Sequence, residues 1–234
     1  MKNDRLGMFT SSKISDLTSN GKSKDSFGKP FYTLCEEKAM EVILKRGLDN
    51  DMRAGATDWG NLCESFAFQL LPLDYAFNVK RYTHINLPWS GIPDSMSANH
   101  VGDIKCPFTL KSAFGMAMLR TGEEVKEHAP WYYWQLVSNA ILCNRSQAEL
   151  AIFVPKITRA KEIMEKAVET ESLIRFKTLA ELPFLPVDSD FPELTRIAFE
   201  IPESDMLFLE GRIIAATEER NAKIDEYKSI FTPH

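Results

Sequence analysis

The sequence has few of the residues that build soft-metal or disulfide sites. It contains four cysteines and four histidines in 234 residues, and no two cysteines form a CxxC pair. Zinc and iron–sulfur sites depend on closely spaced ligand pairs, so the spacing excludes their usual forms. No secretory leader is apparent, and we therefore expect reduced thiols and a cytoplasmic protein.

Long hydrophobic runs and an excess of positive charge are also missing. No stretch approaches the length of a membrane span, so no membrane association is expected. The formal net charge of −5 argues against a surface that is basic throughout, and any contact with nucleic acid would need a local basic groove. The hydrophobic content of 44% and charged content of 26% are typical of a globular protein with one sizeable core.

The most informative stretch is residues 91–109, GIPDSMSANHVGDIKCPFT. Its second half alternates as a half-buried strand does, which places Asp103 and Lys105 on one face and Ile104 on the other. A paired strand that ends near Asp94 would bring a second carboxylate beside them. Two carboxylates and an ammonium suit a hard divalent cation and an attacking water, as phosphodiester hydrolysis requires. The alternative is a hairpin whose charges are simply solvated.

Another carboxylate stands in the middle of a hydrophobic helix. Residues 58–71 carry apolar side chains at helical spacing and nearly all round, which is typical of a buried helix. Glu64 lies at its centre. A buried carboxylate has to be paired, protonated or bound to a metal. A metal-side role and a salt bridge to an arginine or lysine are both open from this pattern.

The N-terminal segment RLGMFTSS begins with Arg5 and continues into hydroxyl side chains. Exposed backbone amides and hydroxyls beside an arginine can bind an anion. A frayed terminus is the alternative. Thr10 or Ser11 could also cap a short helix.

The rest of the pattern predicts helices alternating with strands. A capping box at residues 33–36 predicts a helix to about residue 48, and Pro130 in a first turn predicts a helix to about residue 143. Residues 122–127 are expected to be a charged, solvated segment. The other expected elements are strands at 77–87 and 149–155, helices at 111–120 and 204–231, a charged helix or helix pair at 157–181, and a proline-broken loop and edge at 183–192.

Five segments, in order, resemble the motifs of the PD-(D/E)XK nuclease superfamily and, more narrowly, the lambda-exonuclease (YqaJ-type) viral recombinase family. The matched region runs from residue 5 to residue 155. Two positions depart from the family pattern, since Ser95 follows the PD aspartate in place of glycine and Val137 replaces a second glutamine. The five segments are RLGMFTSS at 5–12, DWGNLCE ending at Glu64, the Pro-Asp pair ending at Asp94, GDIKCPFT beginning at Gly102, and YYWQ ending at Gln135.

The resemblance implies a Mg²⁺ site in which Mn²⁺ can substitute. Lys105 would orient or deprotonate the attacking water, with its pKa lowered for that purpose, and Gln135 would position Lys105 or the water. Arg5 and Ser12 would hold a terminal phosphate. An oxygen-only shell is what Mg²⁺ prefers. The implied ligands are Asp94, Asp103, Glu64 and the carbonyl of Ile104.

We therefore expect one α/β nuclease domain over residues 1–234, with a restriction-endonuclease-like core of a small mixed β-sheet flanked by helices and a helical C-terminal extension over about 157–234. The implied function is that of a metal-dependent deoxyribonuclease, a phage-type 5′-to-3′ exonuclease that acts on duplex DNA ends in recombination within a bacterial host cell. The family also implies a homo-oligomer, a trimeric ring, and a single-strand annealing protein as partner. The alternatives are a related endonuclease or RecB-like repair nuclease, and a non-catalytic DNA-end-binding recombination protein.

Overall fold

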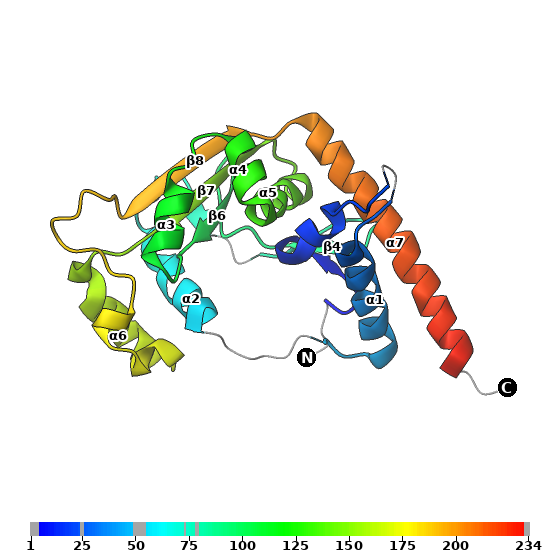
Figure 1. The fold of residues 1–234 in the computed structure, drawn as a ribbon, viewed down its shortest axis with the longest axis horizontal. Helices are drawn as coiled ribbons and strands as arrows, with labels where there is room; N and C mark the ends of the chain where they lie inside the picture. Colours follow the sequence, from blue (N-terminus) through cyan, green and yellow to red (C-terminus); the bar gives the residue numbers. More distant parts are fainter. Residues whose placement is uncertain (1–4, 24–25, 49–54, 73, 78–79, 232–234) are drawn as a thin grey trace.

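A mixed sheet forms the centre of the molecule (Figure 1). Its order is β2-β5-β6-β7-β8, in which β6 and β7 are parallel and all other neighbours are antiparallel. The strands are β2 (Ala76–Phe77), β5 (Ser95–Met96), β6 (His100–Lys105), β7 (Gln147–Phe153) and β8 (Leu194–Glu200). The computed structural model describes residues 5–23, 26–48, 55–72, 74–77 and 80–231. The predicted small mixed sheet flanked by helices is confirmed.

Parallel strands need a crossover connection, and three helices supply it here. They are α3 (Leu110–Ala117), α4 (Gly122–His128) and α5 (Pro130–Leu142). The hydroxyl of Thr109 accepts the N–H of Ser112 and caps α3, while a proline occupies the first turn of α5. Because α5 packs on both β6 and β7, side chains on its inner surface reach the middle of the sheet.

Both faces of the sheet are covered, and β7 points alternate side chains into two hydrophobic cores. Leu150 and Ile152 belong to the core shared with α5 and the C-terminal helix. Phe153 belongs to the core shared with α2 (Gly55–Phe68) and α6 (Ala160–Glu169). A strand buried on both faces needs a nearly continuous hydrophobic run, as LAIF at residues 150–153 provides.

A second, three-stranded sheet carries the chain toward Asp94 and was not predicted. Its order is β1 (Phe9–Thr10), β4 (Trp89–Gly91), β3 (Tyr82–Thr83), with β1 parallel and β3 antiparallel to β4. The strand predicted at 77–87 is therefore wrong: β2 and β3 are separate two-residue strands in different sheets. Strands this short contain no alternation that a sequence could reveal.

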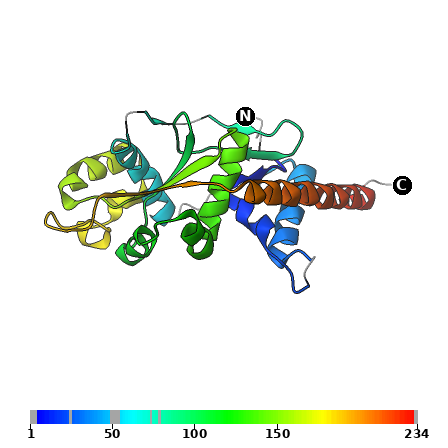
Figure 2. The ribbon, with the colours of Figure 1, turned by 90° about the horizontal axis from the view of Figure 1, so that it is seen from above.

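The two ends of the chain pack together through α1 (Lys29–Leu44) and α7 (Glu203–Phe231), and α7 extends well beyond the sheet (Figure 2). The predicted terminal helix is confirmed. The capping box at 33–36 is wrong, because Pro30 in the first turn starts α1 earlier. Within the described residues, no helix combines the length and apolar character that crossing a membrane would require.

Two charged regions differ from expectation. Residues 122–127 are helical, since Thr121 and Glu124 form a capping box at the start of α4. Over 157–181 the only α-helix is α6, and short 3₁₀ turns surround it. The region 157–234, expected as a helical extension, also supplies β8, which is the edge strand that follows the proline-rich loop.

Candidate active site

The β5–β6 hairpin places the first aspartate. The N–H of Asp94 donates to the carbonyl of Gly102 across 3.0 Å, and Asp94 Oδ2 accepts the N–H of Ile104 across 2.7 Å. Ser95 pairs with Gly102 in the register of the hairpin. Asp94 therefore lies beside β6 as expected, but just before the start of the paired strand rather than at its end.

Asp103 and Lys105 share one face of β6, as the two-residue period of a strand requires. Lys105 Nζ donates to Asp103 Oδ1 at 3.0 Å and lies 2.8 Å from Oδ2. Gln135 Nε2, from α5, donates to the same Oδ1 at 2.7 Å. The Asp103 side chain is fully buried, and its Oδ2 is ion-paired with the Lys105 ammonium but accepts no directed hydrogen bond. This oxygen has a lone pair left for another ligand.

Glu64 reaches the same place from α2. It lines a cavity of about 490 Å³ with Asp94, Ile104, Lys105 and Tyr132. Among the described residues no arginine or lysine forms an ion pair with Glu64, although Lys105 and Lys166 are near enough to favour its charge. The salt-bridge alternative is therefore not realised in the described part of the chain.

Burial and a neighbouring charge raise the pKa of two carboxyl groups of the site. Burial, followed by the charge of Asp103, raises the pKa of Glu64 and that of Asp94. Burial disfavours the ammonium form of Lys105, but the charges of Asp103 and Asp94 outweigh burial and raise its pKa above the ordinary value. The predicted lowering of the Lys105 pKa is wrong for this state, because two anionic neighbours hold its proton.

The donor chemistry of this cluster fits a hard divalent cation. Among the described residues, no three His, Cys, Asp or Glu side chains form a complete metal-binding group. Mg²⁺ does not require one, since it keeps several waters and is usually held by one or two carboxylates and substrate phosphate. Asp94 and Asp103 supply such carboxylates, and Asp103 Oδ2, which is ion-paired with Lys105 but accepts no directed hydrogen bond, has a lone pair for a cation.

A second pocket, of about 100 Å³, brings together Arg5, Ser12 and Gln135. The hydroxyls of Ser12 and Thr10 lie 3.3 Å apart at its edge. Because Gln135 lines this pocket and also bonds Asp103, it connects the pocket to the carboxylate cluster. The predicted phosphate-binding residues and the predicted catalytic residues are therefore neighbours.

The turn that carries Arg5 is well anchored, so the frayed-terminus alternative is wrong for residues 5–12. Met8 N–H donates to the Arg5 carbonyl at 2.9 Å. Gly7 has a φ of 70° and no room for a side chain, because a Cβ would collide with Val42. Its N–H donates to Glu41 Oε2 at 3.0 Å, and its carbonyl accepts from Arg220 Nη1 at 2.5 Å.

The sequence did not identify two residues of these pockets. The ring of Tyr132 lies 5.0 Å from Lys105 Nζ, where a cation–π contact holds the ammonium against the cavity. Its place three residues before Gln135, on the same helix surface, was a usable signal. Arg81 lines the smaller pocket. It had no local signal, because only the pairing of β3 with β4 brings it there.

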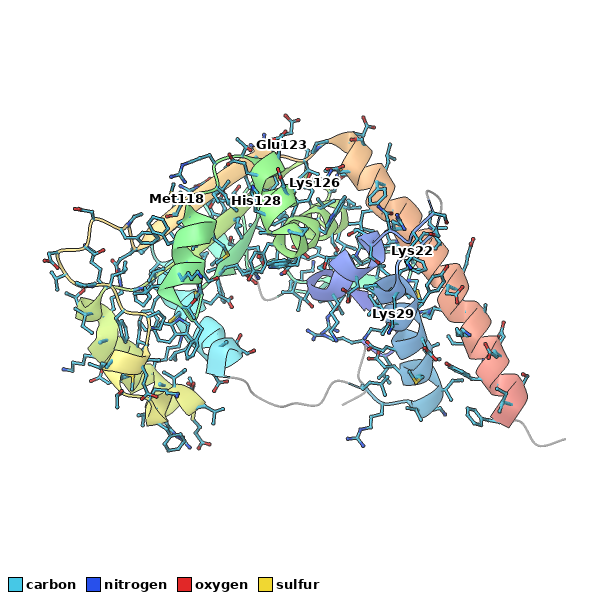
Figure 3. All side chains as sticks on the ribbon, viewed as in Figure 1. Lys22, Lys29, Met118, Glu123, Lys126 and His128 are labelled. Atoms are coloured by element: carbon cyan, nitrogen blue, oxygen red, sulfur yellow. The ribbon has the colours of Figure 1, made fainter. Side chains whose placement is uncertain are left out.

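Two lysines of the segment 18–30, Lys22 and Lys29, lie away from both pockets; Lys24 lies outside the described residues. Lys22 and Lys29 stand beside η1 (Ser11–Thr18) and the start of α1 (Figure 3). Lys126 on α4 has a structural partner, since its ammonium lies 2.7 Å from Asp205 Oδ1 at the start of α7 (Figure 3). None of the three lines either of the two pockets described above.

No protein-family model and no curated protein sequence matches the chain. Solved structures do match it over nearly its whole length. One is a phage-related exonuclease from Haemophilus somnus 129PT, with a TM-score of 0.69 and 16% identity over 94% of this chain and 96% of that chain. Another is the alkaline exonuclease LHK-Exo from Laribacter hongkongensis, with a TM-score of 0.61, 16% identity, and 96% and 93% of the two chains covered. LHK-Exo in complex with dAMP gives a TM-score of 0.62.

The chain therefore has the fold of phage-related and alkaline exonucleases. This confirms the restriction-endonuclease-like α/β core that the motifs predicted. With 94% and 96% of the chain covered, the match includes most of the region beyond residue 155, for which the motifs made no prediction.

Proposed function

We propose that this protein is a Mg²⁺-dependent exodeoxyribonuclease that degrades one strand of duplex DNA from its end in the 5′-to-3′ direction. The observation that carries the proposal is the double contact of Gln135, which bonds Asp103 and lines the pocket of Arg5 and Ser12. An exonuclease needs a hydrolytic centre next to a pocket for the chain end. The fold shared with exonucleases supports the same function.

In the proposed hydrolytic centre, Asp94 and Asp103 hold Mg²⁺, and the Ile104 carbonyl and Glu64 add oxygen donors. A divalent cation held there would supply an activated water and would neutralise charge on the scissile phosphate. Lys105 keeps its ammonium between Asp103 and the ring of Tyr132, from where it can orient the water and donate to a phosphate oxygen. If a bound cation neutralised Asp94 and Asp103, these carboxylates would stabilise the Lys105 ammonium less, and the pKa of Lys105 would fall.

In the proposed end pocket, Arg5 and Ser12 bind the 5′-terminal phosphate. A guanidinium holds phosphate with two parallel charge-assisted hydrogen bonds, and the Ser12 hydroxyl adds a neutral donor. Holding the 5′ end next to the metal places the first phosphodiester of that strand for attack, which gives the proposed polarity. The trimeric ring and the annealing-protein partner remain predictions from the family resemblance.

Two alternatives differ in their use of the pockets. An endonuclease or RecB-like repair nuclease would need the hydrolytic centre and no end pocket. A non-catalytic end-binding protein would need the end pocket alone. Glu64, Asp94 and Lys105 line one cavity, and Asp103 bonds Lys105 there. This cluster, beside a pocket with Arg5, favours the exonuclease.

The test is digestion of linear and closed-circular duplex DNA with Mg²⁺, with each strand of the linear duplex labelled separately at its 5′ end. We expect early release of the 5′ label as mononucleotide from linear DNA and no attack on the circle. Lys105→Ala should lower the rate by about a thousandfold or more, about 4 kcal/mol of barrier. Cleavage of the circle would favour the endonuclease, and binding of ends without hydrolysis would favour the non-catalytic protein.

A further inference from the structure

The position of Arg81 follows from the topology of the three-stranded sheet. β1 and β4 are parallel, so their C-terminal ends lie at the same edge, where Ser11 and Ser12 follow Thr10. β3 is antiparallel to β4, with Tyr82 opposite Gly91, so β3 begins at that edge. The residue just before it, Arg81, therefore lies at the mouth of the pocket that Arg5 also lines.

The pocket between these elements has the composition of an anion site. It is lined by two arginines, four hydroxyl side chains, the amide of Gln135 and no carboxylate. The whole chain has 33 acidic and 28 basic residues, so a cavity with this lining departs from the rest of the protein. Neither Arg5 nor Arg81 forms an ion pair with any acidic residue in the described part of the chain. Two guanidinium groups without an acidic partner favour an anion between them.

Next to Gly91, which lines the pocket, lies a buried amide without hydrogen-bond partners. Gly91 is buried there, and a Cβ on it would collide with Ser11 Oγ and Asn139 Oδ1. Asn139 is fully buried, and neither its oxygen nor its nitrogen has a hydrogen-bond partner. Buried polar atoms are nearly always satisfied in folded proteins, by protein, water or ligand. This amide therefore gives independent support to an occupied polar pocket at Gly91.

We infer that Arg81 is a second phosphate-binding residue, which acts with Arg5 to select a terminal phosphate over an internal one. A terminal phosphomonoester carries close to two negative charges at neutral pH, because its second pKa is about 6, whereas an internal diester carries one. Two guanidinium groups match the dianion and make the chain end the preferred occupant. The inference rests on the proposed exonuclease function and adds to it the residue that completes end recognition.

The experiment measures the binding of blunt duplexes with 5′-phosphate or 5′-hydroxyl ends in the absence of divalent cations. The quantity of interest is the ratio of the two dissociation constants for each protein. Arg81→Ala should lower the phosphate preference about tenfold to a hundredfold, the effect of one charged hydrogen-bonding contact. Arg81→Lys should keep part of the preference, since it keeps the charge and loses the planar fork. The double variant R5A/R81A should bind both ends equally.

The control is Lys161→Ala, which makes the same change in net charge on a side chain that is 85% exposed on α6. It should leave the ratio unchanged. An unchanged ratio in Arg81→Ala, with a clear preference in the wild type, overturns the inference and leaves the proposed function intact. A wild type that digests linear DNA but shows no phosphate preference overturns both Arg81 and Arg5 as end-binding residues. Failure of the wild type to digest DNA overturns the proposed function instead, while the binding ratio still reports on Arg81.

Discussion

Gln135 Nε2 donates a hydrogen bond to Asp103 Oδ1 across 2.7 Å, which joins α5 to β6 at the centre of the carboxylate cluster. Lys105 Nζ donates to the same oxygen across 3.0 Å. Asp103 is therefore held by one neutral and one charged donor. Because Gln135 also lines the smaller pocket, a phosphate bound there would lie next to the side chain that orients Asp103.

We predict that Gln135→Met slows catalysis without preventing DNA binding. Methionine keeps the length of the side chain and removes the donor, so Asp103 loses one of its two hydrogen bonds. A bond to a charged group is worth about 1.5–3 kcal/mol, so kcat should fall about tenfold to a hundredfold. Steady-state digestion of end-labelled duplex gives kcat and KM separately. Gln69→Met, on an exposed residue after α2, is the control, and a normal kcat for Gln135→Met would exclude a role for the bond.

A second prediction concerns the anchor of the N-terminal turn. Lys38 Nζ lies 2.8 Å from Glu41 Oε1, and both side chains are only 6% exposed. Glu41 also accepts the N–H of Gly7. Glu41→Ala leaves a buried ammonium without its partner, and we expect the free energy of unfolding to fall by about 3–5 kcal/mol.

Urea denaturation measures this change. The matched variant is Glu165→Ala, which breaks an exposed pair with Lys161 that is 3.9 Å long. Such a pair is worth at most about 1 kcal/mol, so this variant should unfold almost as the wild type does. Equal losses in both variants would show that the buried pair contributes no more than a surface pair.

The sequence was informative wherever the site depends on local periodicity. The alternation of β6 puts Asp103 and Lys105 on one face and Ile104 in a core, and the structure confirms both placements. The apolar residues on all sides of Glu64 predicted a buried helix at 58–71. The structure has this helix as α2, at residues 55–68. These predictions succeeded because a strand or a helix fixes the direction of a side chain from its own sequence spacing.

Features that depend on contacts between distant segments were not predictable in this way. Arg81 joins Arg5 only because β3 and β1 pair with opposite sides of β4. The pKa of Lys105 depends on how many carboxylates lie close to it in the folded protein. The spacing of residues in the sequence does not give that number. Two local signals, Pro30 and the capping box at 33–36, indicated different starts for α1. The helix begins at Lys29, as the proline indicates.

A third prediction separates charge from shape in the end pocket. Arg5→Ala should lose most of the preference for 5′-phosphate over 5′-hydroxyl ends in the rate of digestion, and Arg5→Lys should keep only part of it. The reason is that lysine is a point charge and cannot make the two parallel hydrogen bonds of a guanidinium. The comparison uses both variants on both substrates. A loss of rate that is equal for the two kinds of end would indicate general weakening of DNA binding rather than loss of a phosphate contact.

The last prediction uses metal binding rather than activity. Burial and the charge of Asp103 raise the pKa of Asp94 in the folded protein. A raised pKa means that the protonated carboxyl stabilises the fold below the unfolded value of about 3.9, and that this contribution is lost as the pH rises through the folded pKa. At neutral pH without metal, the Asp94 carboxylate therefore destabilises the protein.

Asp94→Asn keeps the acceptor for the Ile104 N–H and removes the charge. Its melting temperature without metal should therefore exceed that of the wild type, by about 2–4 °C for each kcal/mol that the free energy of unfolding increases. Mg²⁺ should then raise the melting temperature of the wild type, because a ligand that binds only the folded state stabilises it, and should have little effect on Asp94→Asn. Glu64→Gln should lose part of the Mg²⁺ response. Asp188→Asn, on an exposed loop residue, should respond as the wild type does. A full Mg²⁺ response in Asp94→Asn would remove Asp94 from the metal site whatever the variant does to activity.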